Sequence, residues 1–119
     1  MIGSPSADRP TIETRSPQAG VALVVLGGEH DLASAPEVEQ ALDRCLDIFS
    51  HLIVDLSVTT FLDSSTIAVL LRAKRRADEA DHKFSLVVGG APIVECVLEV
   101  SGVLPTLNVV ATVEQALGV

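Results

Sequence analysis

Asp63, Ser64, Ser65 and Thr66 form a run of four consecutive polar residues whose side chains could take part in phosphate chemistry. They follow an apolar strand and lead directly into the apolar run 67–71, so the pattern predicts a strand, a turn and the start of a helix. Either Asp63 or Ser64 can cap this helix, because a short side chain there accepts hydrogen bonds from unpaired backbone N–H groups. The same N–H groups and the positive end of the helix dipole also suit a phosphate. The run is therefore either a plain helix cap or a cap that carries a phosphorylated serine, Ser64.

No other set of residues in the sequence has the types and spacing of a catalytic site. Ser64 does not lie in a G-x-S-x-G nucleophile elbow, and the histidines, His30, His51 and His82, have no spacing that suggests a proton relay. His51 precedes a strand and His82 lies in a polar stretch, so both are expected at the surface. The histidines and cysteines also lack metal-ligand spacing. We therefore expect no enzyme activity, no catalytic residue, no metal site and no cofactor.

The two cysteines, Cys45 and Cys96, each fall on the apolar face of a predicted helix. Small buried thiols are common in such positions, and neither cysteine belongs to a C-x-x-C pair. We expect both to be free thiols in the core.

The composition favours one globular domain that binds another protein. A chain of 119 residues with 48% hydrophobic residues can build a single core, and without Trp or Tyr it lacks platforms on which nucleic-acid bases stack. The net charge of −8 repels nucleic acid and anionic lipid and favours a partner with a basic face. No apolar run reaches the roughly 18 residues that span a bilayer, and residues 1–10 do not resemble a signal peptide. We expect a cytoplasmic protein that binds neither nucleic acid nor membrane.

Hydrophobic periodicity divides the chain into alternating strands and helices. Strands are expected at 11–15, 21–26, 52–56, 84–88 and 107–110. Helices are expected at 36–50, from 64 to about 80, from Pro92 to Gly102, and after a capping box formed by Thr112 and Gln115. The stretches 27–36 and 57–60 are expected to be loops, and residues 1–10 a flexible tail. The alternation predicts an α/β fold with a mixed, largely parallel sheet that begins with an antiparallel hairpin.

Two separated segments carry a family resemblance. The first contains Gly28, Glu29, Asp31, Leu32, Ala33, Ser34 and Ala35. The second contains Asp55, Leu56, Ser57, Phe61, Leu62, Asp63, Ser64, Ser65 and Ile67. In this order they resemble the STAS domain, in particular the bacterial anti-sigma factor antagonists, and the stretch 102–105 is similar as well. The resemblance covers about 21–117, with Thr66 in place of the family's glycine.

The resemblance implies one STAS domain over 11–119, a central sheet packed against about four helices. It implies an anti-sigma factor antagonist (anti-anti-sigma factor) that regulates transcription in bacteria by partner switching, as in a stress response. The unphosphorylated form would bind an anti-sigma factor kinase with a histidine-kinase-like ATPase fold and so release a sigma factor. Phosphorylation of Ser64, with Ser65 as second choice, would end this binding, and a PP2C-type phosphatase would restore it. The residues expected to contact the partner are Asp31, Asp63, Ser64, Ser65 and Thr66.

Thr66 leaves a second function open. It adds a branched side chain where a kinase would dock, which favours a STAS binding module that is not phosphorylated, as in a transporter or a signalling assembly. The retained Asp63, Ser64 and Ser65 favour the switch. Asp31 is equally compatible with a solvated or capping carboxylate in a turn.

A basic cluster lies on the predicted helix that follows Ser64. It consists of Arg72, Lys74, Arg75 and Arg76. The cluster is either a solvated helix face, whose cations suit the end of the helix, or a contact with an acidic patch on the partner. It is too short to indicate DNA binding.

Overall fold

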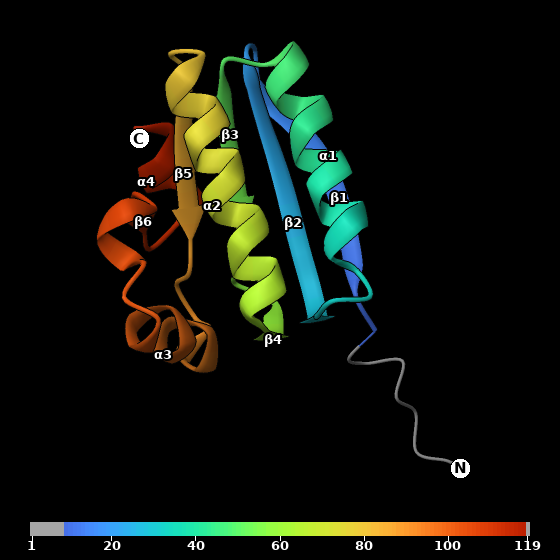
Figure 1. The fold of residues 1–119 in the computed structure, drawn as a ribbon. Coiled ribbons are helices and arrows are strands. Elements are labelled where there is room, and N and C mark those ends of the chain that lie inside the picture. The colour runs from blue at the N-terminus through green and yellow to red at the C-terminus, as the bar shows by residue number, and fades with distance from the viewer. Residues whose placement is uncertain (1–8, 119) are drawn as a thin grey trace.

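The computed structural model describes residues 9–118, which form one six-stranded sheet with helices on both faces (Figure 1). The strands are β1 (Thr11–Gln18), β2 (Val21–His30), β3 (His51–Asp55), β4 (Thr59–Leu62), β5 (Lys83–Val87) and β6 (Val109–Val110). The helices are α1 (Ala35–Ile48), α2 (Ser64–Glu79), α3 (Pro92–Val100) and α4 (Val113–Leu117), with a 3-10 turn at Leu104–Thr106. The predicted α/β fold with four helices is confirmed. Most of the expected tail, residues 1–8, lies outside the described residues.

The sheet is mixed, as expected. Its order is β1-β2-β3-β5-β6, and β4 pairs with the end of β2. β1 and β2 form the antiparallel hairpin, whose turn uses Gly20 at a φ of +78°. The remaining pairs are parallel. Because β2, β3, β4 and β5 run the same way, their carboxyl ends meet at one end of the sheet.

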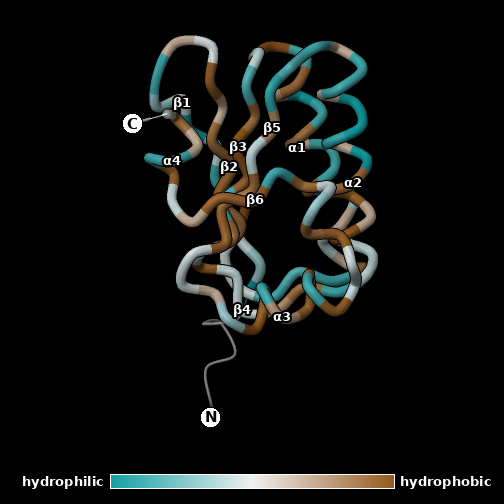
Figure 2. The backbone as a smooth tube through the Cα atoms, turned by 90° about the vertical axis from the view of Figure 1, so that its left-hand side faces the viewer, coloured by the Kyte–Doolittle hydropathy of each residue, from teal (hydrophilic) through white to brown (hydrophobic). Residues whose placement is uncertain are grey.

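The core is aliphatic and lies on both faces of the sheet. Val24 and Val54 belong to the main cluster under α1 and α2, whereas their strand neighbours Leu23 and Ile53 pack with Ala116 of α4. This is the two-residue alternation of a strand, with successive side chains on opposite faces. Figure 1 shows α1 and α2 side by side over the sheet, and Figure 2 shows hydrophobic segments concentrated along the central strands.

Several strand boundaries differ from the expectation. β2 continues to His30 through the segment that was expected to be a loop, and β4 replaces the expected polar loop. The two strands pair in parallel, with Gly28 opposite Thr59 and His30 opposite Leu62, and the Thr59 hydroxyl donates to the carbonyl oxygen of Leu26 at 2.5 Å. Pairing between segments so distant in the chain cannot be seen in local periodicity. β1 is longer than expected, and β6 is shorter.

Two burial predictions are wrong. Cys45 lies in the core, but Cys96 is exposed, because α3 turns Leu98 inward and Cys96 outward. His51 is buried rather than exposed, and its Nε2 lies 3.1 Å from the hydroxyl of Ser85 on the neighbouring strand. Its position at the first residue of β3 suggested a boundary residue, but β3 lies between β2 and β5, and the His51 side chain is on the sheet face that carries α4.

Candidate functional site

The polar run 63–66 lies at the carboxyl end of the parallel strands. Three chain segments meet there, namely the end of β2 with the following loop, the end of β4, and the start of α2 (Figure 1). The backbone N–H of Asp63 donates to the carbonyl oxygen of His30 at 3.2 Å, which joins the start of α2 to the end of β2. This end of an open parallel sheet is where α/β proteins commonly bind ligands and partners.

Asp63 is the N-cap of α2. Its backbone is extended, and its Oδ1 accepts from the N–H of Ser65 at 3.0 Å, from the N–H of Thr66 at 3.2 Å and from the Ser65 hydroxyl at 2.5 Å. Partial burial would raise the pKa of this carboxyl, but the hydrogen bonds from Ser65, Thr66 and the Leu32 N–H outweigh it and lower the pKa. Of the two caps that the sequence allowed, the structure uses Asp63, and it holds that side chain as a carboxylate.

Ser64 and Ser65 differ in how available their hydroxyls are. Ser64 is exposed as the first residue of α2, and no described residue hydrogen-bonds to its hydroxyl. Ser65 is half-buried, and its hydroxyl is held by Asp63. Of the two hydroxyls, that of Ser64 is therefore the more accessible.

Thr66 lies beneath the surface. Its side chain is fully buried, with an exposed fraction of 0%, and its Oγ1 lies 3.5 Å from Asp63 Oδ1. The expectation that Thr66 adds a branched group on the docking surface is wrong, because the third residue of α2 faces the core beside Ile67. Thr66 therefore offers no accessible surface to a partner.

Asp31 lies across from this turn, in the loop between β2 and α1. It is exposed, its Oδ1 accepts from the N–H of Ala33 at 2.9 Å, and its carbonyl oxygen accepts from the N–H groups of Ser34 and Ala35. The carboxylate of Asp31 thus stabilises the turn before α1, and the N-cap of that helix is Ser34. The turn also leaves the rest of the carboxylate at the surface near Asp63, because the next residue, Leu32, donates its N–H to Asp63.

His30 also belongs to this site, although its spacing in the sequence indicated no role. The ring is fully buried, with Nε2 3.0 Å from the carbonyl oxygen of Gly27 and Nδ1 3.0 Å from the hydroxyl of Ser34. A carbonyl only accepts, so Nε2 carries the proton and Nδ1 accepts from Ser34. Burial lowers the pKa of His30 despite these contacts. The neutral ring thus fastens the end of β2 to the start of α1.

Two exposed apolar side chains flank the Asp63 turn. Leu32 precedes α1 and Phe61 belongs to β4. Beside Leu32, a groove of about 310 Å³ runs between α1 and α2 and reaches Ser65. Apolar groups that stay exposed next to polar ones are typical of a protein interaction surface.

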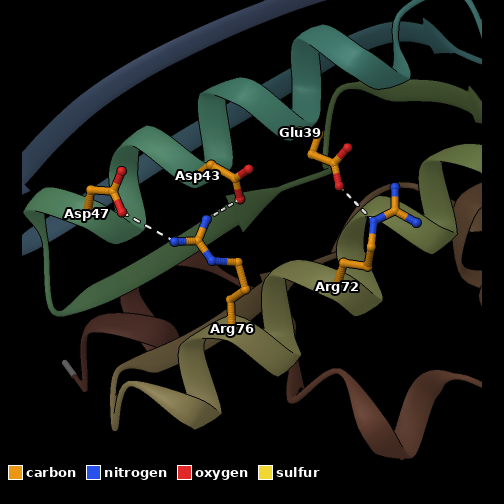
Figure 3. A network of polar contacts seen from close by, with 5 residues as sticks. All are labelled: Glu39, Asp43, Asp47, Arg72 and Arg76. Carbon is orange, nitrogen blue, oxygen red and sulfur yellow. Dashed lines mark hydrogen bonds and ion pairs between the residues drawn. The ribbon is translucent and has the colours of Figure 1, made fainter.

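Two arginines of the basic cluster on α2 form ion pairs with α1 (Figure 3), and Lys74 pairs with Asp78 on α2 itself. Arg72 pairs with Glu39 of α1 at 2.7 Å, and Arg76 pairs with Asp43 and, at 3.2 Å, with Asp47. These contacts join the exposed sides of the two helices, which favours the solvated-face alternative over a contact with an acidic partner. In the part of the chain that the structure describes, there is no cluster of metal-binding side chains and no helix long and apolar enough to cross a membrane.

Comparison with known proteins agrees with this geometry. Residues 13–116 match the STAS domain family. The anti-sigma-F factor antagonist RsfB of Mycobacterium tuberculosis is 29% identical over 99 residues, which are 82% of this chain and 80% of that protein. An anti-sigma factor antagonist from Mycobacterium paratuberculosis has a similar crystal structure, with a TM-score of 0.83, 28% identity and 93% of each chain covered.

A further solved structure shares the fold at lower identity. The phosphorylated form of the Bacillus cell fate determinant SpoIIAA superimposes with a TM-score of 0.69 and 18% identity, covering 91% of this chain and 97% of that one. At that identity the likeness concerns the fold alone. The family and the antagonist relatives support the expectation that this chain is not an enzyme.

Proposed function

Because the chain belongs to the STAS domain family, we propose that it is an anti-sigma factor antagonist controlled by phosphorylation of Ser64. The unphosphorylated form binds an anti-sigma factor and releases a sigma factor, and the phosphorylated form does not. The observation that carries this proposal is the state of Ser64, an exposed hydroxyl without a hydrogen bond at the first position of α2. The 29% identity to a protein named as an antagonist supports the choice of partner.

The start of α2 can accept a phosphate without a change of fold. Phosphate adds nearly two negative charges, which the N-terminus of a helix tolerates. The effect falls on the complex instead, because the new charge lies beside the ionised Asp63 and the exposed Asp31. A partner surface that contacts this turn must then desolvate or repel an additional dianion, and the complex weakens.

The proposal assigns the chemistry of phosphate transfer to the partners. The anti-sigma factor, with a histidine-kinase-like ATPase fold, supplies magnesium, ATP and the general base, and a PP2C-type phosphatase removes the phosphate. This chain supplies only the hydroxyl and the contact surface around Asp31, Asp63, Ser64 and Ser65. The cycle takes place in the cytoplasm, where the sigma factor acts.

Intact-mass measurement tests the switch. The protein is incubated with Mg-ATP and purified anti-sigma factors from the organism that encodes it, with the anti-sigma-F factor of M. tuberculosis as a further candidate. We expect one added phosphate, retained in the matched control Ser65→Ala and lost in Ser64→Ala. Calorimetry should show that the phosphorylated form binds the kinase at least about tenfold more weakly.

The other outcomes of this measurement are equally informative. Addition that survives Ser64→Ala would move the site to Ser65. Tight binding without phosphate addition would favour the second candidate, a binding module of a transporter or signalling assembly. The observation behind that candidate is Thr66 in place of the family's glycine, and the burial of its side chain removes the steric objection to a kinase.

A further inference from the structure

Helix α3 carries an apolar stripe on its outer side. Val94 and Leu98 face the core, whereas Ile93 and Val100 are 62% and 82% exposed and Cys96 lies between them at the surface. With the half-buried Val97, these outer residues recur at steps of three and four, which is one face of a helix. A nine-residue helix therefore buries one side in this fold and offers a second apolar side to a partner.

The stripe continues into a groove beside β4. The groove has a volume of about 250 Å³ and lies between the loop that carries Val58 and the start of α3 at Pro92 and Ile93. Val58, at 57% exposure, and Ile93 stand at its two sides. Several exposed aliphatic side chains around one hollow can seat an apolar side chain of another protein.

The negative charges beside the stripe limit which kind of protein surface can cover it. Glu95 and Glu99 are exposed on α3, and neither forms an ion pair with a described residue. Two copies of the chain, each with a net charge of −8, would bring like charges together across such a contact. A surface with apolar side chains flanked by Lys or Arg would satisfy both the stripe and the glutamates.

The stripe also adjoins the proposed switch. α3 packs against β4, and β4 ends at the residue before Asp63 (Figure 2). We infer that α3 is a second docking surface for the anti-sigma factor, formed by Val58, Ile93, Cys96 and Val100 and matched by an apolar, basic-flanked surface of that partner. The inference rests on the proposed function. It adds a contact that phosphorylation at Ser64 does not touch.

Two serine substitutions test the surface directly. The double variant Ile93→Ser/Val100→Ser removes apolar contacts from exposed positions, and Ile48→Ser, at a residue 75% exposed at the far end of α1, is the matched control. Binding to the anti-sigma factor that captures the wild-type chain is measured by calorimetry. We expect the double variant to bind about tenfold more weakly or worse, and the control to match the wild type. Equal binding by all three proteins would overturn the docking surface and leave the proposed function standing.

Cys96 provides an independent readout that needs no variant. Cys45 is 4% exposed and burial raises its pKa, so N-ethylmaleimide should label Cys96 alone. We expect the bound anti-sigma factor to slow this labelling strongly. An unchanged labelling rate in a saturated complex would refute the contact. Failure of the wild-type chain to bind any anti-sigma factor would instead overturn the proposed function, and the inference with it.

Sedimentation velocity of the free protein tests whether a second copy of this chain covers the α3 stripe instead. We expect a monomer for both the wild type and the double serine variant. A wild-type dimer that Ile93→Ser/Val100→Ser dissolves would show that a second copy covers the stripe and would overturn the assignment to the anti-sigma factor.

Discussion

At the scale of single residues, Asp63 determines which hydroxyl of the α2 first turn is free. One oxygen of its carboxylate collects two backbone N–H groups and the Ser65 hydroxyl. Removing that oxygen by Asp63→Ala would leave the start of α2 without its side-chain acceptor and would release the Ser65 hydroxyl. The cap and the proposed phosphate acceptor are therefore separate, neighbouring residues, since the Ser64 hydroxyl forms no hydrogen bond with a described residue.

His30 predicts how stability depends on pH. Burial lowers its pKa in the folded protein, and burial together with Lys83 lowers that of His51. In the unfolded chain both titrate near the ordinary value of about 6.5. The unfolded state then binds more protons as the pH falls, so the stabilisation is complete above that value and is lost below it. We expect the free energy of unfolding, measured in urea, to decrease from about pH 7.5 to pH 5.5.

Two histidine variants test whether His30 and His51 cause the decrease in the free energy of unfolding at low pH. His30→Gln and His51→Gln should each flatten part of the slope, even where they lower stability at every pH. Asp31 is the charged group near the His30 ring, and its carboxylate favours the protonated form, so it opposes the effect of burial. An unchanged slope in the double variant would show that neither histidine has a lowered pKa in the folded protein.

At the scale of elements, aliphatic packing holds α1 and α2 together far more than their ion pairs do. Leu42 of α1 and Leu70 of α2 are fully buried in the main core, whereas Arg76 and its carboxylate partners are exposed. We expect Leu70→Ala to cost about 2–5 kcal/mol of unfolding free energy. Arg76→Ala should cost less than about 1 kcal/mol, because exposed ion pairs are weak.

Urea unfolding with Arg75→Ala as control measures this difference. Arg75 is exposed on the same helix and has no ion pair with a described residue. Added salt should reduce the small gap between the Arg76 and Arg75 variants and leave the Leu70→Ala loss in place. A loss for Arg76→Ala as large as that for Leu70→Ala would contradict this ranking.

The sequence predicts those features that depend on local pattern, and it does not predict those that depend on tertiary packing. Periodicity located the helices and most strands, because each of them buries one apolar face, and cap chemistry located Asp63 and Ser64. β4 was missed although Thr59, Thr60 and Phe61 are good strand formers, because its pairing with β2 is a tertiary event. Burial at individual positions, such as Thr66, depends on how an element is rotated against its neighbours, which the sequence alone did not specify.

At the scale of the whole molecule, carboxylates that form no ion pair gather at the carboxyl end of the parallel strands. The described carboxylates there that form no ion pair are Glu29, Asp31, Glu37, Asp55, Asp63, Glu95 and Glu99. Arginines of α2 face the carboxylates of α1 instead (Figure 3). The net charge of −8 is thus concentrated around the proposed switch and the α3 stripe, where it can attract a basic partner before contact.

This arrangement predicts where charge controls the rate of association. Glu29→Gln/Glu95→Gln and Glu79→Gln/Glu114→Gln each change the net charge from −8 to −6, but the second pair lies on α2 and α4, away from the switch. In stopped-flow mixing with the anti-sigma factor, association should slow with added salt for the wild type and for the second pair. The first pair should associate more slowly at low salt and depend less on salt. If both pairs behave alike, net charge rather than its placement steers the encounter, because a field that depends on the total charge alone does not distinguish one end of the molecule from the other.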